Sequence, residues 1–173
     1  MVGGEALAGE KRVRSAPFRF HLKRVGTGLK RPLREDEDMS PAIPERVARL
    51  IEAVQAWASA RPDILGVALV GSHARQAARL DSDVDLVIVC QSPSSYLERA
   101  EWIGLFGAPK RTARENWGRV TSLRAWYADG LEVEFGIADR DWGSAPLDPG
   151  TRRVIEEGCI VLFDRGKAFS GLA

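Results

Sequence analysis

The chain has 173 residues, a length that one hydrophobic core can serve without a second domain. Hydrophobic residues make up 45% and charged residues 28%, which is typical of globular proteins. Twenty-five basic and 24 acidic residues give a formal net charge of +1, which argues against nucleic acid as a partner. No apolar run has the length or position of a membrane helix or a signal peptide, so we expect a cytoplasmic protein without a membrane partner.

The two cysteines support the same expectation about location. Cys90 and Cys159 are far apart in the sequence, and each lies inside an apolar run. No second pair of cysteines is present that could complete a metal cluster. We therefore predict that both thiols are reduced and buried in the core.

The first 39 residues differ from the rest in charge and hydropathy. Nine Lys or Arg residues and one His lie between Lys11 and Arg34, and an acidic run follows at 35–38. Because apolar residues show no period here, we predict a poorly ordered basic extension over residues 1–39 and a domain over 40–173. A basic arm for nucleic acid or an acidic partner, and translation from Met39, are alternative interpretations.

The hydrophobic pattern of residues 43–90 predicts two helices and two strands. Apolar residues at helical spacing predict an amphipathic helix from Ile43 to about Ala60. The apolar run 64–70 predicts a buried strand, and a short helix is expected over 72–78. The run 84–90 is apolar without interruption at its end, which indicates a strand buried on both faces.

The second half of the chain predicts a hairpin between two helices. We expect a helix over 94–105 and a loose, Arg-rich stretch up to residue 116. Strands over 120–127 and 131–137 flank Ala128-Asp129-Gly130, which is a hairpin signal. A helix near 151–157 and a strand over 159–163 follow. Together these elements predict an α/β (α+β) fold with a mixed sheet flanked by helices in a single domain.

A glycine-serine pair stands between the first predicted strand and the short helix. Gly71 allows the backbone to approach an anion, and the Ser72 hydroxyl and nearby N–H groups can donate to it. Arg75 lies one helical turn further on and can hold a phosphate. These three residues are candidates for nucleotide binding. A plain turn is the alternative interpretation.

Two aspartates stand at the entrance of the second predicted strand. Asp83 and Asp85 are two positions apart, so both side chains point to one face of that strand. Two adjacent carboxylates repel one another, and a divalent cation removes that cost. Oxygen ligands of this kind suit magnesium or manganese. A solvated strand end is the alternative interpretation.

A third carboxylate is offered by the strand predicted over 131–137. Its apolar residues alternate with Glu132, Glu134 and Gly136, which gives one apolar and one acidic face. If this strand neighbours that of Asp85, three carboxylates can hold two metal ions about 3.5–4 Å apart. We choose Glu134 over Glu132 because it lies in the middle of the apolar frame. Both glutamates could instead be solvent-facing residues of an amphipathic strand.

The combined pattern is more specific than its parts. Gly71-Ser72-His73-Ala74-Arg75 followed by Ser82-Asp83-Val84-Asp85-Leu86 resembles the nucleotidyltransferase superfamily, which includes DNA polymerase beta and the aminoglycoside and minimal nucleotidyltransferases. The segments 102–107 and 133–135 look like its streptomycin adenylyltransferase branch. The resemblance implies that Gly71 and Ser72 bind the triphosphate. It also implies that Asp83 and Asp85 bind metal and that Glu134 is the third carboxylate.

By that resemblance, the chain transfers AMP from ATP to an acceptor hydroxyl and releases pyrophosphate, with two Mg²⁺ ions held by Asp83, Asp85 and Glu134. The alternative is a nucleotide-binding or partner-regulating module without turnover, similar to an antitoxin-like minimal nucleotidyltransferase. Two departures motivate it: Gln76 stands where many relatives have glycine, and the chain ends soon after Phe163. A helical protein partner or a homo-oligomer is expected in that case.

The remaining polar and aromatic candidates are predicted to be structural. We interpret His73 as a loop residue rather than a general base, and Asp139 and Asp141 as solvated loop residues. The tryptophans are expected to pack in the core or at its edge. A solvated loop is expected for the basic cluster, which consists of Lys110, Arg111 and Arg114.

Overall fold

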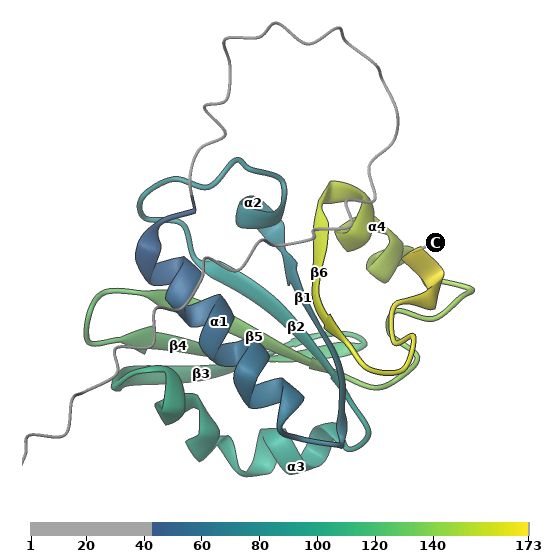
Figure 1. Cartoon of the computed structure of the whole chain (residues 1–173), viewed down its shortest axis with the longest axis horizontal. Helices are drawn as coiled ribbons and strands as arrows, with labels where there is room; N and C mark the ends of the chain where they lie inside the picture. Colours follow the sequence, from purple (N-terminus) through teal and green to yellow (C-terminus); the bar gives the residue numbers. More distant parts are fainter. Residues whose placement is uncertain (1–42, 173) are drawn as a thin grey trace, which may run out of the picture.

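The computed structural model describes residues 43–172, which form one mixed six-stranded sheet with helices on both faces (Figure 1). The predictions for residues 1–39 lie outside these residues. The elements in chain order are α1 (Glu45–Ser59), β1 (Ile64–Val70), α2 (Gly71–Ala74), β2 (Val84–Cys90), α3 (Pro93–Glu98), the 3₁₀ helix η1 (Ala100–Phe106), β3 (Pro109–Trp117), β4 (Val120–Tyr127), β5 (Glu132–Ala138), α4 (Pro149–Glu157), β6 (Cys159–Asp164) and the 3₁₀ helix η2 (Ser170–Leu172). None of the helices within 43–172 is long and apolar enough to cross a membrane.

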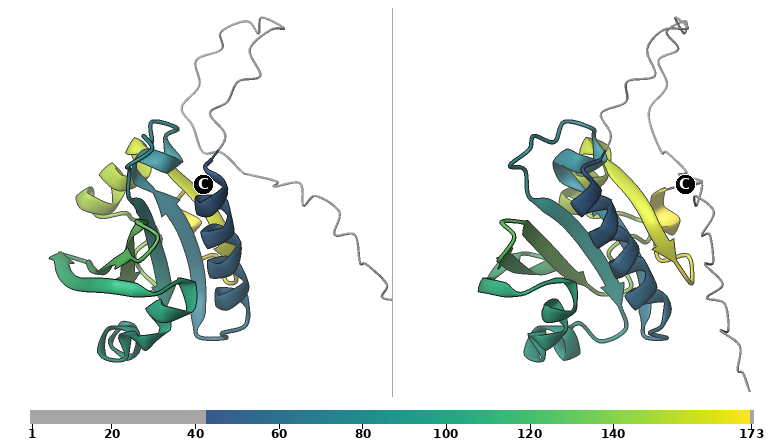
Figure 2. Two further views of the ribbon diagram at one scale, coloured as in Figure 1. Left: turned by 90° about the vertical axis from the view of Figure 1, so that its left-hand side faces the viewer. Right: turned by 60° about the vertical axis from the view of Figure 1, so that its left-hand side comes forward.

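The strand order β3-β4-β5-β2-β1-β6 places β2 and β5 side by side at the centre of the sheet. These two strands are parallel, and every other pair in the sheet is antiparallel. Figure 2 shows α1 and α4 on opposite sides of the sheet. The predicted α/β class with a mixed sheet in a single domain is therefore confirmed.

The central strand β2 is buried on both faces, as its apolar run predicts. Leu86 and Ile88 pack in the cluster that includes the inward face of α1. Val87 and Val89 pack in a second cluster on the other face, with Trp142 and Phe169. Since side chains alternate along a strand, Asp85 lies on this second face, away from α1.

The aromatic residues of the first cluster stack closely beneath the sheet. The rings of Trp57 in α1 and Trp102 in η1 lie 5.0 Å apart and nearly parallel. Trp102 also meets Phe135 of β5 edge to face, with centroids 5.1 Å apart. These contacts join α1 to the segment 93–106 and cover the apolar face of β5. Core packing is thus confirmed for Trp57 and Trp102, whereas Trp117 is 62% exposed.

Three predicted elements differ from the structure. The single helix expected over 94–105 is two helices, because Arg99 leaves helical geometry (φ −116°, ψ 78°) between α3 and η1. The short helix expected over 72–78 ends at Ala74. The Arg-rich stretch predicted to be a loop is the strand β3, so the loop interpretation of Lys110 and its basic neighbours is wrong. Most of β3 is exposed at the sheet edge, and its sequence therefore lacks the alternation that identifies half-buried strands.

Candidate active site

Three carboxylates converge where β2 and β5 run side by side. Asp85 is the direct partner of Glu134 across the parallel pair, and Asp83 precedes β2 by one residue. Each of the three side chains has a carboxylate oxygen within 4.8 Å of one from each of the others, and all three residues are partly buried. The structure therefore brings together the three acidic residues that the sequence proposes. Glu132 lies outside this triad.

The local sequence explains why the acids face the same side. In β5 the residues Val133, Phe135 and Ile137 fill the core beneath α1 and η1, so Glu134 has to point to the opposite face. In β2 the same rule places Asp85 on that face. Parallel pairing in register then sets the two carboxylates next to each other.

The carboxyl of Asp85 has an unusual proton affinity. Its pKa is raised to about 7, first because the group is buried and then because the charges of Asp83 and Glu134 repel its own. The positive charges of Arg124 and Arg75 oppose this rise. No hydrogen bond reaches the Asp85 carboxylate from any residue within 43–172. Asp85 therefore titrates near neutral pH, unlike an ordinary surface aspartate.

Arg124 of β4 is a site residue that the sequence reasoning missed. Its guanidinium lies 3.0 Å from Asp83 Oδ2 through Nη1 and forms an ion pair with Glu134 Oε2 through Nη2. Nη1 also lies 2.7 Å from Glu132, and Nε lies 3.3 Å from Glu115. Although burial opposes it, these acidic partners raise the pKa of Arg124. The predicted hairpin could have identified it. If residues are paired outwards from the turn at 128–130, Arg124 lies opposite Glu134.

Ser122 holds the third carboxylate from the other side. Its buried hydroxyl donates a hydrogen bond of 2.7 Å to Glu134 Oε1. With Oε2 bound by Arg124, both oxygens of Glu134 have a partner. Glu134 is consequently fixed in orientation, and its partners both belong to β4.

The glycine-serine loop contacts the triad directly. Gly71 adopts a left-handed conformation (φ +68°), and a Cβ added there would lie 2.1 Å from Asp85 Oδ2. The Ser72 hydroxyl, next in the chain, is buried and has no hydrogen-bond partner within residues 43–172. Gln76 takes the left-handed φ of +61° that glycine favours at such a position. The side chain of Arg75 is exposed at the end of α2.

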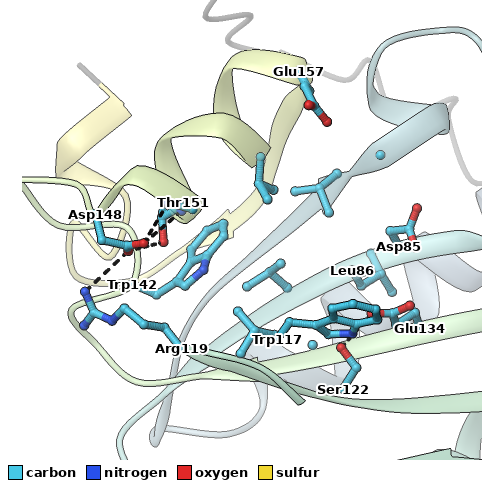
Figure 3. A pocket seen from close by; sticks show the side chains of 17 residues that line it. Asp85, Leu86, Trp117, Arg119, Ser122, Glu134, Trp142, Asp148, Thr151 and Glu157 are labelled. Carbon is cyan, nitrogen blue, oxygen red and sulfur yellow. Dashed lines mark hydrogen bonds and ion pairs between the residues drawn. The ribbon is translucent and has the colours of Figure 1, made fainter. Parts of the chain in front are cut away.

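A pocket of about 320 Å³ opens beside the carboxylates, between the sheet and α4 (Figure 3). Asp85 and Glu134 lie at one end of the pocket, and Trp142 and α4 form its opposite wall. The exposed indole of Trp117 lines it from the end of β3. The apolar part of its lining includes Val70, Val87, Val120 and Val154. A cavity of this size can receive a small organic molecule with one end at the triad.

The other polar candidates lie away from the triad or serve the fold. His73 is buried in α2, and burial lowers its pKa, which keeps the ring neutral at pH 7. Asp139 and Asp141 are exposed after β5, as expected, and Asp139 forms an ion pair of 3.3 Å with Arg119. Cys90 and Cys159 are buried and unpaired, as predicted.

The donor set of the triad fits a hard divalent cation. Carboxylate oxygens from Asp83, Asp85 and Glu134 are the ligands that magnesium and manganese prefer, and their mutual separation is compatible with one shared site. Within residues 43–172, no hydrogen bond to the Asp85 carboxylate has to break for such an ion to bind. Arg124 contacts the other two carboxylates, so a metal ion would bind next to its guanidinium.

Comparison with known proteins agrees with the resemblance predicted from residues 71–86. Residues 45–124, slightly less than half of the chain, match the family model described as streptomycin adenylyltransferase. This match confirms the resemblance to the nucleotidyltransferase superfamily. No curated protein sequence matches the chain.

Solved structures with a similar arrangement include an aminoglycoside 6-adenyltransferase from Bacillus subtilis. It is 17% identical, with a TM-score of 0.44, and the match covers 58% of this chain and 37% of that one. A CCA-adding enzyme in complex with ATP is 16% identical, with a TM-score of 0.41 and coverages of 75% and 31%. A Thermotoga maritima CCA-adding enzyme complexed with tRNA is 15% identical, with a TM-score of 0.37 and coverages of 76% and 32%. The chain thus spans only about a third of the length of these enzymes.

Proposed function

Because residues 45–124 match the streptomycin adenylyltransferase family, we propose that the chain is a metal-dependent nucleotidyltransferase. It transfers AMP from ATP to the hydroxyl of an acceptor and releases pyrophosphate. The convergence of Asp83, Asp85 and Glu134 beside the glycine-serine loop is the observation that carries this proposal. Carboxylates this close repel one another, and a cation bound among them offsets that repulsion.

In this proposal Asp83, Asp85 and Glu134 hold magnesium, and two ions are expected. Magnesium supplies a lowered pKa at the attacking hydroxyl and offsets negative charge on the leaving pyrophosphate. The raised pKa of Asp85 supports a ligand role. Burial and neighbouring charges disfavour the ionised carboxylate, and a bound cation would stabilise it.

We assign the triphosphate to Gly71, Ser72 and Arg75. The absence of a Cβ at Gly71 lets the backbone come close to Asp85, so a phosphate held by this loop would lie next to the triad. The unpaired hydroxyl of Ser72 supports the assignment, because a buried donor without a partner is costly until a ligand accepts from it. Arg75 adds a positive charge from the end of α2.

We assign the acceptor to the pocket between the sheet and α4. Glu134 lies at one end of this pocket, and Ser122 donates a hydrogen bond to it. Glu134 is therefore the candidate that accepts the proton of the acceptor hydroxyl as the bond to phosphorus forms. The size of the pocket supports a small acceptor rather than a macromolecular one. The two unpaired buried cysteines support a cytoplasmic location.

The test measures AMP transfer from ATP labelled at the α-phosphate, together with pyrophosphate release, in the presence of Mg²⁺ and a cell extract as the source of acceptors. Asp83→Ala combined with Asp85→Ala is expected to abolish both signals. The matched control is Asp139→Ala combined with Asp141→Ala, a second Asp-x-Asp pair that lies outside the triad. Activity that survives the first double substitution contradicts the proposal.

A nucleotide-binding module without turnover is the second candidate. The ion pairs that Arg124 forms with Asp83 and Glu134 favour it, because a guanidinium occupies two of the three carboxylates that catalysis would use to hold metal. A helical protein partner or a second copy of the chain would then complete the function. Magnesium-dependent ATP binding without pyrophosphate release, together with a partner that co-purifies, distinguishes this candidate from the first.

A further inference from the structure

We propose that Arg124 pairs with Asp83 and Glu134 when no metal is bound. When a divalent cation binds the triad, Arg124 keeps only its other carboxylate partners, Glu115 and Glu132. This inference rests on the proposed function, because it concerns the same three carboxylates. It makes Arg124 a positioning residue, since the guanidinium acts through Asp83 and Glu134 rather than on a substrate. Its predicted signature is a metal affinity that rises when the arginine is removed.

The sheet places Arg124 beside the triad by register. Arg124 of β4 is the direct partner of Glu134 in β5, and Glu134 is the direct partner of Asp85 in β2. Directly paired residues point to the same face of a sheet, so the three side chains form a row across three adjacent strands. The side chain of Arg124 is only 18% exposed, so solvent screens its charge poorly.

The guanidinium divides its contacts between two groups of carboxylates. Towards the triad it reaches Asp83 at 3.0 Å and forms an ion pair with Glu134. Away from the triad it reaches Glu132 at 2.7 Å and Glu115 at 3.3 Å. Nε lies near Glu115 without hydrogen-bond geometry and has no other partner within 43–172, so this contact is not yet optimal.

This division supplies a second resting position for the arginine. A cation bound by the triad would draw on the carboxylates of Asp83 and Glu134, and the guanidinium contacts both of them. When these contacts break, Arg124 keeps two carboxylate partners in Glu115 and Glu132 and does not have to enter solvent. A small rotation towards Glu115 would also turn the 3.3 Å contact of Nε with Glu115 into a hydrogen bond.

The charges decide the direction of the exchange. One guanidinium faces five carboxylates, namely those of Asp83, Asp85, Glu115, Glu132 and Glu134. A divalent ion brings twice the charge of the arginine to the triad, and the arginine stays close enough to Glu115 and Glu132 to offset one of their two charges. Free metal therefore has to compete with a resident cation, which lowers its affinity for the protein.

The experiment titrates Mn²⁺ into the full-length, metal-free protein at pH 8 and measures free Mn²⁺ by electron paramagnetic resonance. Arg124→Gln is expected to bind Mn²⁺ at least about tenfold more tightly than the wild type, because the competing charge is removed. Arg124→Lys keeps the charge but lacks the fork that spans both groups of carboxylates, so its affinity should fall between the two. Arg119→Gln, which removes an arginine that contacts Asp139 and Asp148 instead, is expected to bind like the wild type.

The outcomes separate this inference from the proposed function. Unchanged or weaker Mn²⁺ binding in Arg124→Gln overturns the role of Arg124, provided that the wild type binds Mn²⁺ with a non-hydrolysable ATP analogue. If Arg124→Gln does not fold, an unchanged affinity in Arg124→Lys overturns it. A wild type that binds neither Mn²⁺ nor the analogue instead contradicts the proposed function.

Discussion

Asp85 is the residue at which the fold and the proposed chemistry conflict most directly. It lies on the central strand, in contact with Gly71 and opposite Glu134, where burial and like charges raise its pKa to about 7. In the unfolded chain an aspartate ionises near pH 4. Between these values the unfolded state has lost its proton and the folded state has kept it. Stability therefore falls as pH rises from about 4 to about 7.

Asp85→Asn is accordingly expected to stabilise the metal-free protein. The amide removes a charge that the fold disfavours, and the gain should be on the order of 1 kcal/mol or more at pH 8. The gap in melting temperature between variant and wild type, measured in EDTA, should widen between pH 5 and pH 8. Asp141→Asn, at an exposed position, is the control and should show no such widening. A variant that melts below the wild type at pH 8 contradicts this account of Asp85.

Gly71 allows a second test at the same scale. Gly71→Ala places a methyl group 2.1 Å from Asp85 Oδ2 and forces an L side chain into a left-handed conformation. The backbone cost alone is about 1–2 kcal/mol, and the displaced Asp85 should also weaken Mn²⁺ binding. Gly104→Ala is the matched control, because a Cβ there meets nothing within 4 Å. Thermal unfolding and Mn²⁺ titration should both change for Gly71→Ala and stay the same for the control.

At the scale of the element, α4 depends on its first residues. Asp148 precedes the helix and accepts hydrogen bonds from the backbone N–H groups of Gly150 (3.0 Å) and Thr151 (3.1 Å). These bonds satisfy two donors that a helix start leaves free. Because α4 forms one wall of the pocket, its N-terminus also determines the shape of the proposed acceptor site.

Asp148→Ala is expected to lower stability by about 1 kcal/mol through the loss of this cap. In a domain of this size the melting temperature should fall by about 2–4 °C. Glu156→Ala removes a charge from the exposed face of the same helix without removing a cap, so it should not destabilise. Equal losses in the two variants would show that charge, rather than capping, accounts for the effect.

At the scale of the whole molecule, the sheet has one long unpaired edge. Among residues 43–172, β3 pairs with β4 alone, and most of its nine residues are exposed. Charged residues on such an edge prevent it from pairing with another molecule. Lys110 and Arg114 are exposed on β3, while Arg111 stacks over the ring of Trp126 at 3.5 Å. The basic cluster of β3 thus has a structural explanation that requires no ligand.

Replacing Lys110 and Arg114 with valine is expected to promote association through the β3 edge. The double variant should form larger species in size-exclusion chromatography and scatter more light than the wild type at the same concentration. The control is Arg152→Val combined with Arg153→Val on the exposed side of α4. It also replaces two exposed basic residues with valine, but away from the sheet edge. A monomeric β3 variant contradicts the protective role of these charges.

The sequence predicted those parts of the molecule that depend on local pattern. β2 begins and ends as expected because its residues from Leu86 to Cys90 form an unbroken apolar run. The meeting of Asp85 with Glu134 depends on a parallel pairing between segments almost fifty residues apart, which the local pattern could propose only as a condition. Arg124 was missed because its importance lies in four partners from separate segments rather than in a motif. β3 was missed because an exposed edge imposes no alternation.

The turn between β4 and β5 has a consequence for sequence variation. Three residues, 128–130, connect Tyr127 to Leu131, and this spacing, together with the apolar face of β5, sets Arg124 opposite Glu134. Surface loops usually tolerate insertions, but one added residue here would slip the hairpin and turn Arg124 towards the apolar core. The length of this loop therefore matters for the triad, because it determines whether Arg124 and Glu134 face each other.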